Sequence, residues 1–310
     1  MLKKISIIIP FYNPGVLIKN NFRNLNEIQI ENPDLQIIYV DNNSSDKSYS
    51  YVKNKIKQNK NIKIYKTNSN QGPGIARNLG VKKTKTKYII FLDVDDCLEI
   101  INLKKLYKVL EQKKPNVVYL KKIKEINSPS IKFGKKNLNI FFKKKINLET
   151  IATIFNVNFL NTNKISFKSG IFEDILFNFK YHFFNKKKIL YSSDVIYNKI
   201  SNPKSITGSN IDRVKILNRY KAWLGVKLFI RKKIKKKEYK SLMTFFQFRV
   251  RGELVNDYVR IQKSRFPRKK ERYLISYLLH LYKKIIRSQL NSRRTFKDKI
   301  AYKILNEKKI

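Results

Sequence analysis

Apolar, β-rich runs alternate with stretches of helical periodicity through the first 120 residues of the chain. The runs are continuous rather than alternating, which is typical of strands that are buried on both faces of a sheet. They predict strands at residues 5–11, 36–40, 62–65, 88–92 and 116–120. Polar turns and capping residues between them predict helices at about 16–25, up to about 56, 75–81 and 102–113. This alternation of strand and helix favours a parallel, Rossmann-like sheet with right-handed crossovers.

The pattern changes after residue 120. We expect, in order, antiparallel strands and loops over 121–145, a helix over 148–159, a turn at 161–164, a short strand at 165–167, an amphipathic helix from about 170 to 184, strands at 189–191 and 195–197, and a loop at 201–207. From Asp212 onwards the chain is predicted to be helical, with basic faces.

An acidic cluster follows the run Tyr88–Leu92. Three carboxylates, Asp93, Asp95 and Asp96, fall within four positions, although the whole chain has only 22 acidic residues. Ligands in open α/β sheets bind at the carboxyl ends of strands. Carboxylates this close repel one another unless a cation lies among them, so the cluster predicts a Mg²⁺ or Mn²⁺ site that holds a diphosphate. The alternative is an acidic loop without metal that caps the next helix through Asp96 or Asn102.

Two further motifs, around Gly170 and at residues 72–74, have a structural interpretation. Glu173 and Asp174 follow Gly170 at the start of a predicted helix, where acids are also favoured by the helix dipole. The first strand is not followed by Gly-x-Gly-x-x-Gly, so a nicotinamide enzyme is disfavoured. The glycines at 72–74 follow the third strand and are interpreted as a turn.

The chain is strongly basic, with 69 Lys and Arg residues against 22 acids and a net charge of +47. The lysines are dispersed, and such a field attracts nucleic acid, anionic lipid headgroups or phosphorylated substrates. The abundance of Lys, Ile and Asn also fits the compositional drift of an AT-rich genome. Residues 265–310 hold 15 basic residues against 3 acids. The predicted helix at 273–287 has two interpretations: a helix that lies in a membrane interface, which we favour, and a core-facing helix with a solvated basic face.

Other sequence features exclude several classes of protein. The single cysteine, Cys97, allows no internal disulfide and suits a reducing compartment. His182 and His280 make no zinc pattern. The N-terminal apolar stretch is too short for a signal peptide, and nowhere are there ~20 uninterrupted apolar residues, so no transmembrane helix is expected.

Four segments of the sequence, taken in their order along the chain, resemble the motifs of a known protein family. They are Ser6–Asn13, Val40–Asp46, Asn70–Gly72 with Ala76–Gly80, and Phe91–Asp96. In order and approximate spacing they resemble the family 2 glycosyltransferases of GT-A fold. The resemblance is close over residues 4–98 and looser to Thr207, through Gly170–Phe177 and the tyrosine and serine loop from Tyr197. The C-terminal third lies outside it.

The resemblance implies an α/β fold of the GT-A class, a Rossmann-like nucleotide-diphospho-sugar transferase with a mixed sheet flanked by helices. It implies a catalytic domain at 1–210, with a nucleotide-binding part at about 1–98 and an acceptor-binding part at about 99–210. Residues 211–310 are then a helical, basic C-terminal region.

The resemblance also assigns roles to residues. Asp41 resembles the carboxylate that reads the nucleotide base, Arg77 the arginine near the diphosphate, and Asp174 the catalytic base. Asp93 and Asp95 resemble the Asp-x-Asp metal motif for Mg²⁺ or Mn²⁺, with Asp95 favoured as the direct ligand. The full set of residues expected to bind the nucleotide sugar is Pro10, Phe11, Tyr12, Asn13, Asp41, Arg77, Asp93, Val94 and Asp95.

The implied reaction is inverting, metal-dependent transfer of a sugar, with UDP favoured as the nucleotide, to a hydroxyl of a glycan acceptor. The expected setting is capsule or lipooligosaccharide synthesis on a lipid-linked acceptor, in the cytoplasm or peripherally on the inner membrane face. The Gln-x-x-Arg-Trp pattern of processive synthases is absent, which favours a non-processive enzyme that adds one sugar per encounter. Neither histidine lies in the metal motif that some relatives have. The alternatives are a basic nucleic-acid-binding protein and a catalytically silent nucleotide-sugar binder.

Overall fold

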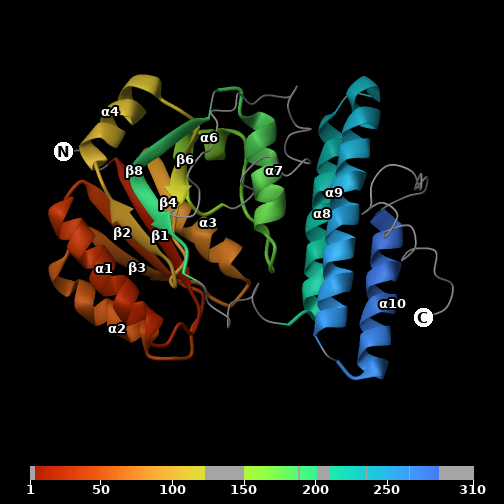
Figure 1. Ribbon diagram of the computed structural model, residues 1–310. Helices are drawn as coiled ribbons and strands as arrows, with labels where there is room; N and C mark the ends of the chain where they lie inside the picture. The colour runs from red at the N-terminus through yellow and green to blue at the C-terminus, as the bar shows by residue number, and fades with distance from the viewer. Residues whose placement is uncertain are drawn as a thin grey trace. The chain divides into compact units, whose positions relative to one another are not determined.

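The computed structural model describes residues 4–122, 150–187, 189–200, 210–234, 236–264 and 266–285. The chain divides into two compact units, Met1–Asn137 with Leu148–Asn202, and Leu138–Asn147 with Pro203–Ile310. The described part of the first unit is an α/β structure, and that of the second is helical (Figure 1).

The first unit is built on a mixed sheet with the strand order β3-β2-β1-β4-β7-β6-β8-β5. The strands are β1 (Ile5–Phe11), β2 (Leu35–Asp41), β3 (Ile62–Lys66), β4 (Tyr88–Phe91), β5 (Cys97–Ile100), β6 (Val117–Lys122), β7 (Thr153–Asn156) and β8 (Leu190–Asn198). The first four strands in this order, β3, β2, β1 and β4, are parallel to one another. β7 is antiparallel to both β4 and β6, β8 is parallel to β6, and β5 is antiparallel to β8. The predicted mixed sheet is therefore confirmed.

Helices cover both faces of this sheet (Figure 1). They are α1 (Leu17–Glu31), α2 (Ser48–Lys55) with the 3₁₀ turn Ile56–Gln58, α3 (Pro73–Lys83), α4 (Leu103–Lys113), α6 (Val157–Thr162) and α7 (Asp174–Phe184). Successive strand residues point to opposite faces, so Ile7 and Ile9 join the core that also holds residues of α1, α2 and α4. Ile8 points the other way, towards α3, and a Cβ on Gly80 would lie only 2.3 Å from its Cγ2.

The structure corrects four predicted elements. The helix expected at 148–159 is wrong, because residues 153–156 form β7 and only Val157–Thr162 is helical. Phe155 is fully buried in mid-sheet, with ring centroids 5.9 Å from Phe91 and 5.4 Å from Phe177. Residues 165–167 are not in the sheet, and the two strands expected at 189–191 and 195–197 are one strand, Leu190–Asn198. The strand β5 was not predicted. The segments 123–145 and 201–207 lie outside the described residues.

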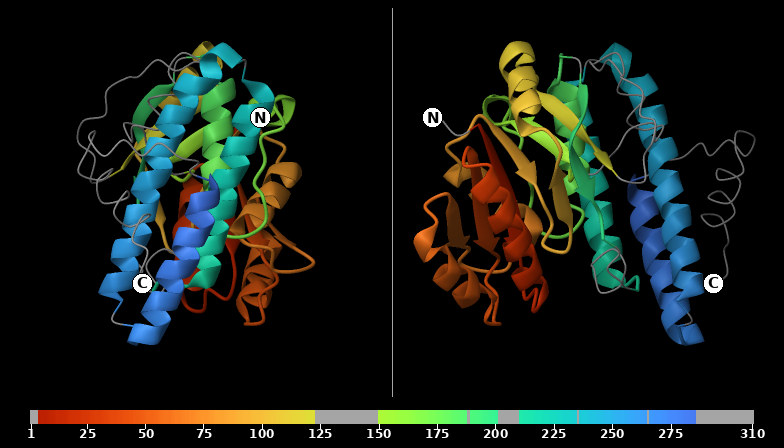
Figure 2. Two further views of the ribbon diagram at one scale, coloured as in Figure 1. Left: turned by 90° about the vertical axis from the view of Figure 1, so that its right-hand side faces the viewer. Right: turned by 60° about the vertical axis from the view of Figure 1, so that its left-hand side comes forward.

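The second unit contains α8 (Arg213–Lys233), α9 (Lys236–Lys263) and α10 (Arg268–Ile285), which lie side by side (Figure 2). A buried polar group links two of them, because Arg219 of α8 forms ion pairs with Asp257 and, at 3.6 Å, with Glu253 of α9. Burial raises the pKa of Asp257 to about 6. The unit therefore has a core that contains charges as well as apolar side chains.

The apolar face of α10 is buried in this unit, through Leu274, Ile275, Leu278 and Leu281. This finding agrees with the core-facing interpretation of the helix and not with insertion of that face into a membrane interface. The exposed residues of α10 include Lys269, Lys270 and Arg272. Among the described residues, every helix is too short or too polar to cross a membrane.

Candidate active site

The carboxyl ends of β1, β2 and β4 meet at one edge of the sheet, because these strands are parallel and in register. Phe11 pairs with Asp41, and Ile8 pairs with Phe91. The loops that follow the three strands carry most of the residues that the sequence singled out. Their position is the usual place for a ligand in an open α/β sheet.

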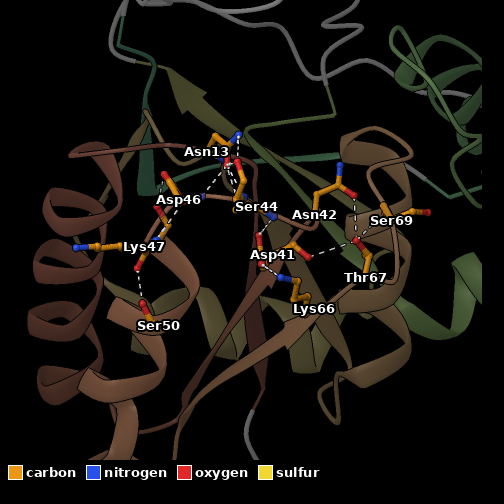
Figure 3. Close-up of polar contacts among 12 residues, drawn as sticks. Asn13, Asp41, Asn42, Ser44, Asp46, Lys47, Ser50, Lys66, Thr67 and Ser69 are labelled. Atoms are coloured by element: carbon orange, nitrogen blue, oxygen red, sulfur yellow. Dashed lines mark hydrogen bonds and ion pairs between the residues drawn. The ribbon is translucent and has the colours of Figure 1, made fainter.

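The loops after β1 and β2 are tied together by Asn13 (Figure 3). Asn13 adopts a left-handed backbone conformation, with φ of 44°, which asparagine tolerates better than most residues. Its Oδ1 accepts from the backbone N–H of Ser45 at 2.8 Å, and its own N–H donates to Oγ of Ser44 at 2.9 Å. The N–H of Gly15 donates to Oδ2 of Asp46 at 3.1 Å. The two loops therefore form one fixed rim.

Asp41 lies behind this rim, at the end of β2, and is fully buried. Its Oδ1 accepts from the N–H of Ser44 at 2.8 Å, while Oδ2 has no hydrogen-bond partner in the part of the chain that the structure describes. Lys66 Nζ is 3.6 Å from that oxygen (Figure 3). A buried acceptor without a donor is costly, so Oδ2 is suited to accept an N–H from a ligand.

The predicted Pro10–Asn13 segment divides into two parts. Pro10 and Phe11 belong to β1 and are buried, whereas Tyr12 and Asn13 are exposed, with Tyr12 50% exposed. Only the second pair can therefore present side chains to a ligand without a change of structure.

The acidic cluster forms a turn after β4, in which the N–H of Asp96 donates to the carbonyl of Asp93 at 3.0 Å. Asp93, Asp95 and Asp96 each have an oxygen that lies within 4.8 Å of the others. A set of carboxylate oxygens is the donor chemistry that Mg²⁺ and Mn²⁺ prefer, so the residues fit such an ion.

Asp96 differs from its two neighbours. It is buried, and burial raises its pKa to about 6. Its Oδ2 accepts from the hydroxyl of Tyr197 at 2.5 Å, and its Oδ1 accepts from the N–H of Ile200 at 2.9 Å. Asp96 therefore ties the turn to β8 and to the segment just after it, and does not cap the next helix. The cap of α4 is Asn102, which accepts from the N–H of Lys105.

Arg77 of α3 joins the acidic turn to the start of α7. Its Nη2 lies 2.8 Å from Oδ1 of Asp93, and its Nη1 lies 2.5 Å from Oε1 of Glu173. Burial would lower the pKa of Arg77, but the two carboxylates outweigh it and raise that pKa. Burial raises the pKa of Glu173, against the opposing effect of Arg77. Sequence reasoning left Glu173 without a role at this site.

Glycines at the start of α3 allow α7 to approach this closely. Gly72 has φ of 91°, and a Cβ there would lie 2.3 Å from the carbonyl oxygen of Gly170. The N–H of Gly170 donates to the carbonyl of Gln71 at 2.9 Å. A Cβ on Gly74 would lie 2.6 Å from Cγ of Glu173. The segment Gly72–Gly74, which was interpreted as a simple turn, is thus also a packing contact for the residues before α7.

A second contact holds the segment before α7 against α3. The side-chain amide of Asn78 donates to the carbonyl of Phe167 and accepts from its N–H, both at 3.0 Å. The Phe167 ring stacks on Phe177 with centroids 4.0 Å apart, and the Arg77 guanidinium lies 5.5 Å from the Phe167 centroid. Arg77 is therefore held by packing as well as by charge.

Asp174 is the first residue of α7, directly after Glu173. Burial and the charge of Glu173 raise the pKa of Asp174 to about 7, although Arg77 opposes the shift. A carboxyl group with a pKa near neutrality can accept a proton efficiently at physiological pH.

His182 is a core residue. Its Nδ1 donates to the carbonyl of Asn178 at 2.7 Å, so its Nε2 accepts from the hydroxyl of Tyr119 at 2.8 Å. Burial lowers the pKa of His182 to about 4. Both ring nitrogens are engaged, which agrees with the absence of a metal motif around this histidine.

Comparison with known proteins shows that the chain is similar to glycosyltransferases. The family model of glycosyl transferase family 2 matches residues 6–172, which is more than half of the chain. A poly(ribitol-phosphate) beta-glucosyltransferase of Bacillus spizizenii is 31% identical over 202 residues, which make up 63% of this chain and 32% of that protein. The poly(ribitol-phosphate) beta-N-acetylglucosaminyltransferase TarP of Staphylococcus aureus is 28% identical over 207 residues, 63% of this chain and 62% of TarP. The chain thus matches less than two thirds of the length of either relative.

A solved structure extends the likeness to most of the chain. Staphylococcus aureus TarS 1–349, in complex with UDP-GlcNAc, matches with a TM-score of 0.67 and 19% identity, over 91% of this chain and 81% of that one. At this identity the likeness concerns the fold alone.

Proposed function

Because this chain belongs to glycosyltransferase family 2 and has the GT-A fold, we propose that it transfers a sugar from a nucleoside diphosphate to a hydroxyl group of a glycan acceptor. The observation that carries the proposal is the bridge from the partly buried Asp93 through the buried Arg77 to the buried Glu173, which directly precedes Asp174. It joins a candidate diphosphate site to a candidate base.

The donor is proposed to be a UDP-sugar, bound by the part of the chain up to about residue 98. Oδ2 of Asp41 has an ion-pair contact with Lys66 but no hydrogen-bond donor among the described residues, so it suits the single ring N–H of uracil. The exposed ring of Tyr12 is available on the same rim. TarS was solved with UDP-GlcNAc, which supports the choice of nucleotide.

Asp93 and Asp95 are proposed to hold Mg²⁺ or Mn²⁺. The ion would supply Lewis-acid stabilisation of the departing diphosphate. Arg77 keeps Asp93 in place through its 2.8 Å ion pair, so the position of the carboxylate does not depend on the loop alone.

Asp174 is proposed to be the base, in a part of the chain, about 99–210, that binds the acceptor. It would take the proton of the acceptor hydroxyl as that oxygen bonds to the anomeric carbon and the bond from carbon to the diphosphate oxygen breaks. A single in-line displacement inverts the configuration at that carbon and requires no covalent intermediate. One sugar is then added per encounter.

The acceptor is proposed to be a bacterial surface polysaccharide or lipooligosaccharide. The net charge of +47 favours an acceptor that carries phosphate groups, as the poly(ribitol-phosphate) in the names of two relatives does. The same charge, through exposed Lys269, Lys270 and Arg272 of α10, could attach the protein to an anionic membrane face.

A screen of nucleotide sugars with Mn²⁺ tests this proposal. We expect one UDP-sugar to raise the melting temperature and to be slowly hydrolysed, with faster release of UDP when a phosphate-containing glycan is added. Stabilisation without any turnover would instead identify a silent nucleotide-sugar binder. Salt-sensitive binding to duplex nucleic acid, with no effect of any nucleotide sugar, would identify the nucleic-acid-binding alternative.

A further inference from the structure

The hydroxyl group of Tyr197 touches both ends of the acidic turn. It donates to Oδ2 of Asp96 at 2.5 Å and lies 3.5 Å from the backbone nitrogen of Asp93. A phenol has one proton, which is given to Asp96, so towards Asp93 the oxygen acts as an acceptor from the N–H. The tyrosine therefore contacts the first residue of the turn through the backbone and the last through its side chain.

A backbone hydrogen bond closes the same turn from the other side. The N–H of Asp96 donates to the carbonyl of Asp93 at 3.0 Å. Together these contacts form a closed ring through Asp93, Asp96 and the Tyr197 hydroxyl. Asp93 and Asp95 are only partly buried in this turn, whereas Asp96 and Tyr197 are buried.

The sheet fixes Tyr197 itself. Tyr197 belongs to β8 and pairs with Leu98 of β5, the strand that begins directly after Asp96. The second oxygen of Asp96 accepts from the N–H of Ile200, just beyond β8. The turn is thus anchored by one connection to β8 and one to the residues just after it. Both carboxylate oxygens of Asp96 are used in these two hydrogen bonds.

We propose that Tyr197 and Asp96 are positioning residues, which hold the carboxylates of Asp93 and Asp95 together for a divalent cation. The proposal rests on the proposed function and assigns Asp96 to the support of the site and not to the metal ligands. Neighbouring carboxylates repel one another, so a turn without this anchor opens when no cation is bound. Anchored ligands bind metal better because less order has to be created on binding.

The test measures the affinity for Mn²⁺ in the presence of UDP, by calorimetry and by the electron paramagnetic resonance of free Mn²⁺. Tyr197→Phe removes only the hydroxyl, and we expect Mn²⁺ to bind roughly 10- to 100-fold more weakly. Weak UDP binding without metal should not change. The matched control is Tyr39→Phe, which removes a buried hydroxyl that donates to Asn21 at 2.9 Å and should leave Mn²⁺ affinity unchanged. Wild-type Mn²⁺ affinity in Tyr197→Phe would overturn the proposal.

Two variants at Asp96 separate support from ligation and remain informative if Tyr197→Phe does not fold. Asp96→Asn keeps an oxygen for the Ile200 N–H and can donate to the Tyr197 hydroxyl, so we expect a smaller loss than in Asp96→Ala. Adding Tyr197→Phe to Asp96→Ala should cause a smaller loss than Tyr197→Phe causes in the wild type, because the two changes share the hydrogen bond from Tyr197 to Asp96. Equal losses in Asp96→Asn and Asp95→Asn would make Asp96 a ligand and overturn the proposal. If the wild-type protein binds no Mn²⁺ with UDP, the proposed metal site fails first.

Discussion

Arg77 and Glu173 form a buried ion pair, Nη1 to Oε1 at 2.5 Å, although 96 positions separate them in the chain. The pair joins α3, which follows β3, to the residue directly before α7. Because Arg77 also pairs with Asp93, one guanidinium orders groups from both parts of the site. The ion pairs of Arg77 therefore fix the positions of Asp93 and Glu173 relative to each other.

Arg77→Ala should lower the free energy of unfolding by about 3 kcal/mol, since it leaves the Glu173 carboxylate buried without its partner. Urea denaturation of the two proteins measures the difference. The matched control is Lys4→Ala, which breaks the more exposed pair of Lys4 with Glu111, 2.6 Å apart, and should change stability by less than about 1 kcal/mol. Equal losses in the two variants would show that the buried bridge does not stabilise the fold.

Asp174→Asn should reduce the turnover number by about 10²- to 10⁴-fold, because the amide cannot accept the proton of the acceptor. Donor affinity should stay within a few-fold of wild type, since Asp174 is not assigned to the donor. Single-turnover transfer and calorimetric donor binding measure the two quantities. Asp34→Asn, a change of the same kind in the loop before β2, serves as the control. Wild-type turnover in Asp174→Asn would remove Asp174 from the role of base.

The same residue predicts how transfer depends on pH. Its pKa of about 7 is set by burial, by the charges of Glu173 and Asp93, and by the opposing charge of Arg77. The ionised form is the base, so the active fraction rises from about one tenth at pH 6 to about nine tenths at pH 8. We expect kcat/KM for the acceptor to rise through this range in wild type and to be flat in Asp174→Asn. A wild-type profile that falls with increasing pH would contradict the assignment.

His182 predicts a loss of stability in mild acid. Its folded pKa of about 4 is below the unfolded value near 6.5, so the neutral form is favoured by folding and its contribution is lost as pH falls from 6.5 towards 4. Between pH 7 and pH 5 this loss amounts to about 2 kcal/mol. Urea denaturation at the two values should show this loss in wild type, and His182→Gln should lack that part of it. An identical pH dependence in both proteins would exclude His182 as the cause.

The sequence was informative where a residue's position depends on its own strand. Asp41, Asp93 and Asp95 follow buried runs, and parallel strands carry them to one edge of the sheet. Two short strands were not predicted, because they depend on partners that are distant in the chain. Cys97 of β5 pairs with Asn198, and Phe155 of β7 lies between β4 and β6. A four-residue run carries too little periodicity to show this.

The supporting residues of the site were missed for the same reason. Glu173 reaches Arg77 only because Gly74 has no side chain, and Tyr197 reaches Asp96 only because β5 pairs with β8. Neither approach can be seen in local spacing. The sequence therefore predicted the groups proposed to meet the ligand, while the residues that position them depend on the tertiary fold.

The central claim is that the acidic turn binds the donor diphosphate through a divalent cation. Calorimetric titration of UDP with and without Mn²⁺, on wild type, Asp95→Ala and the exposed control Glu99→Ala, tests it most directly. We predict that Mn²⁺ strengthens UDP binding at least tenfold in wild type and in Glu99→Ala, and has no effect in Asp95→Ala. Equal enhancement by Mn²⁺ in wild type and Asp95→Ala would contradict the account.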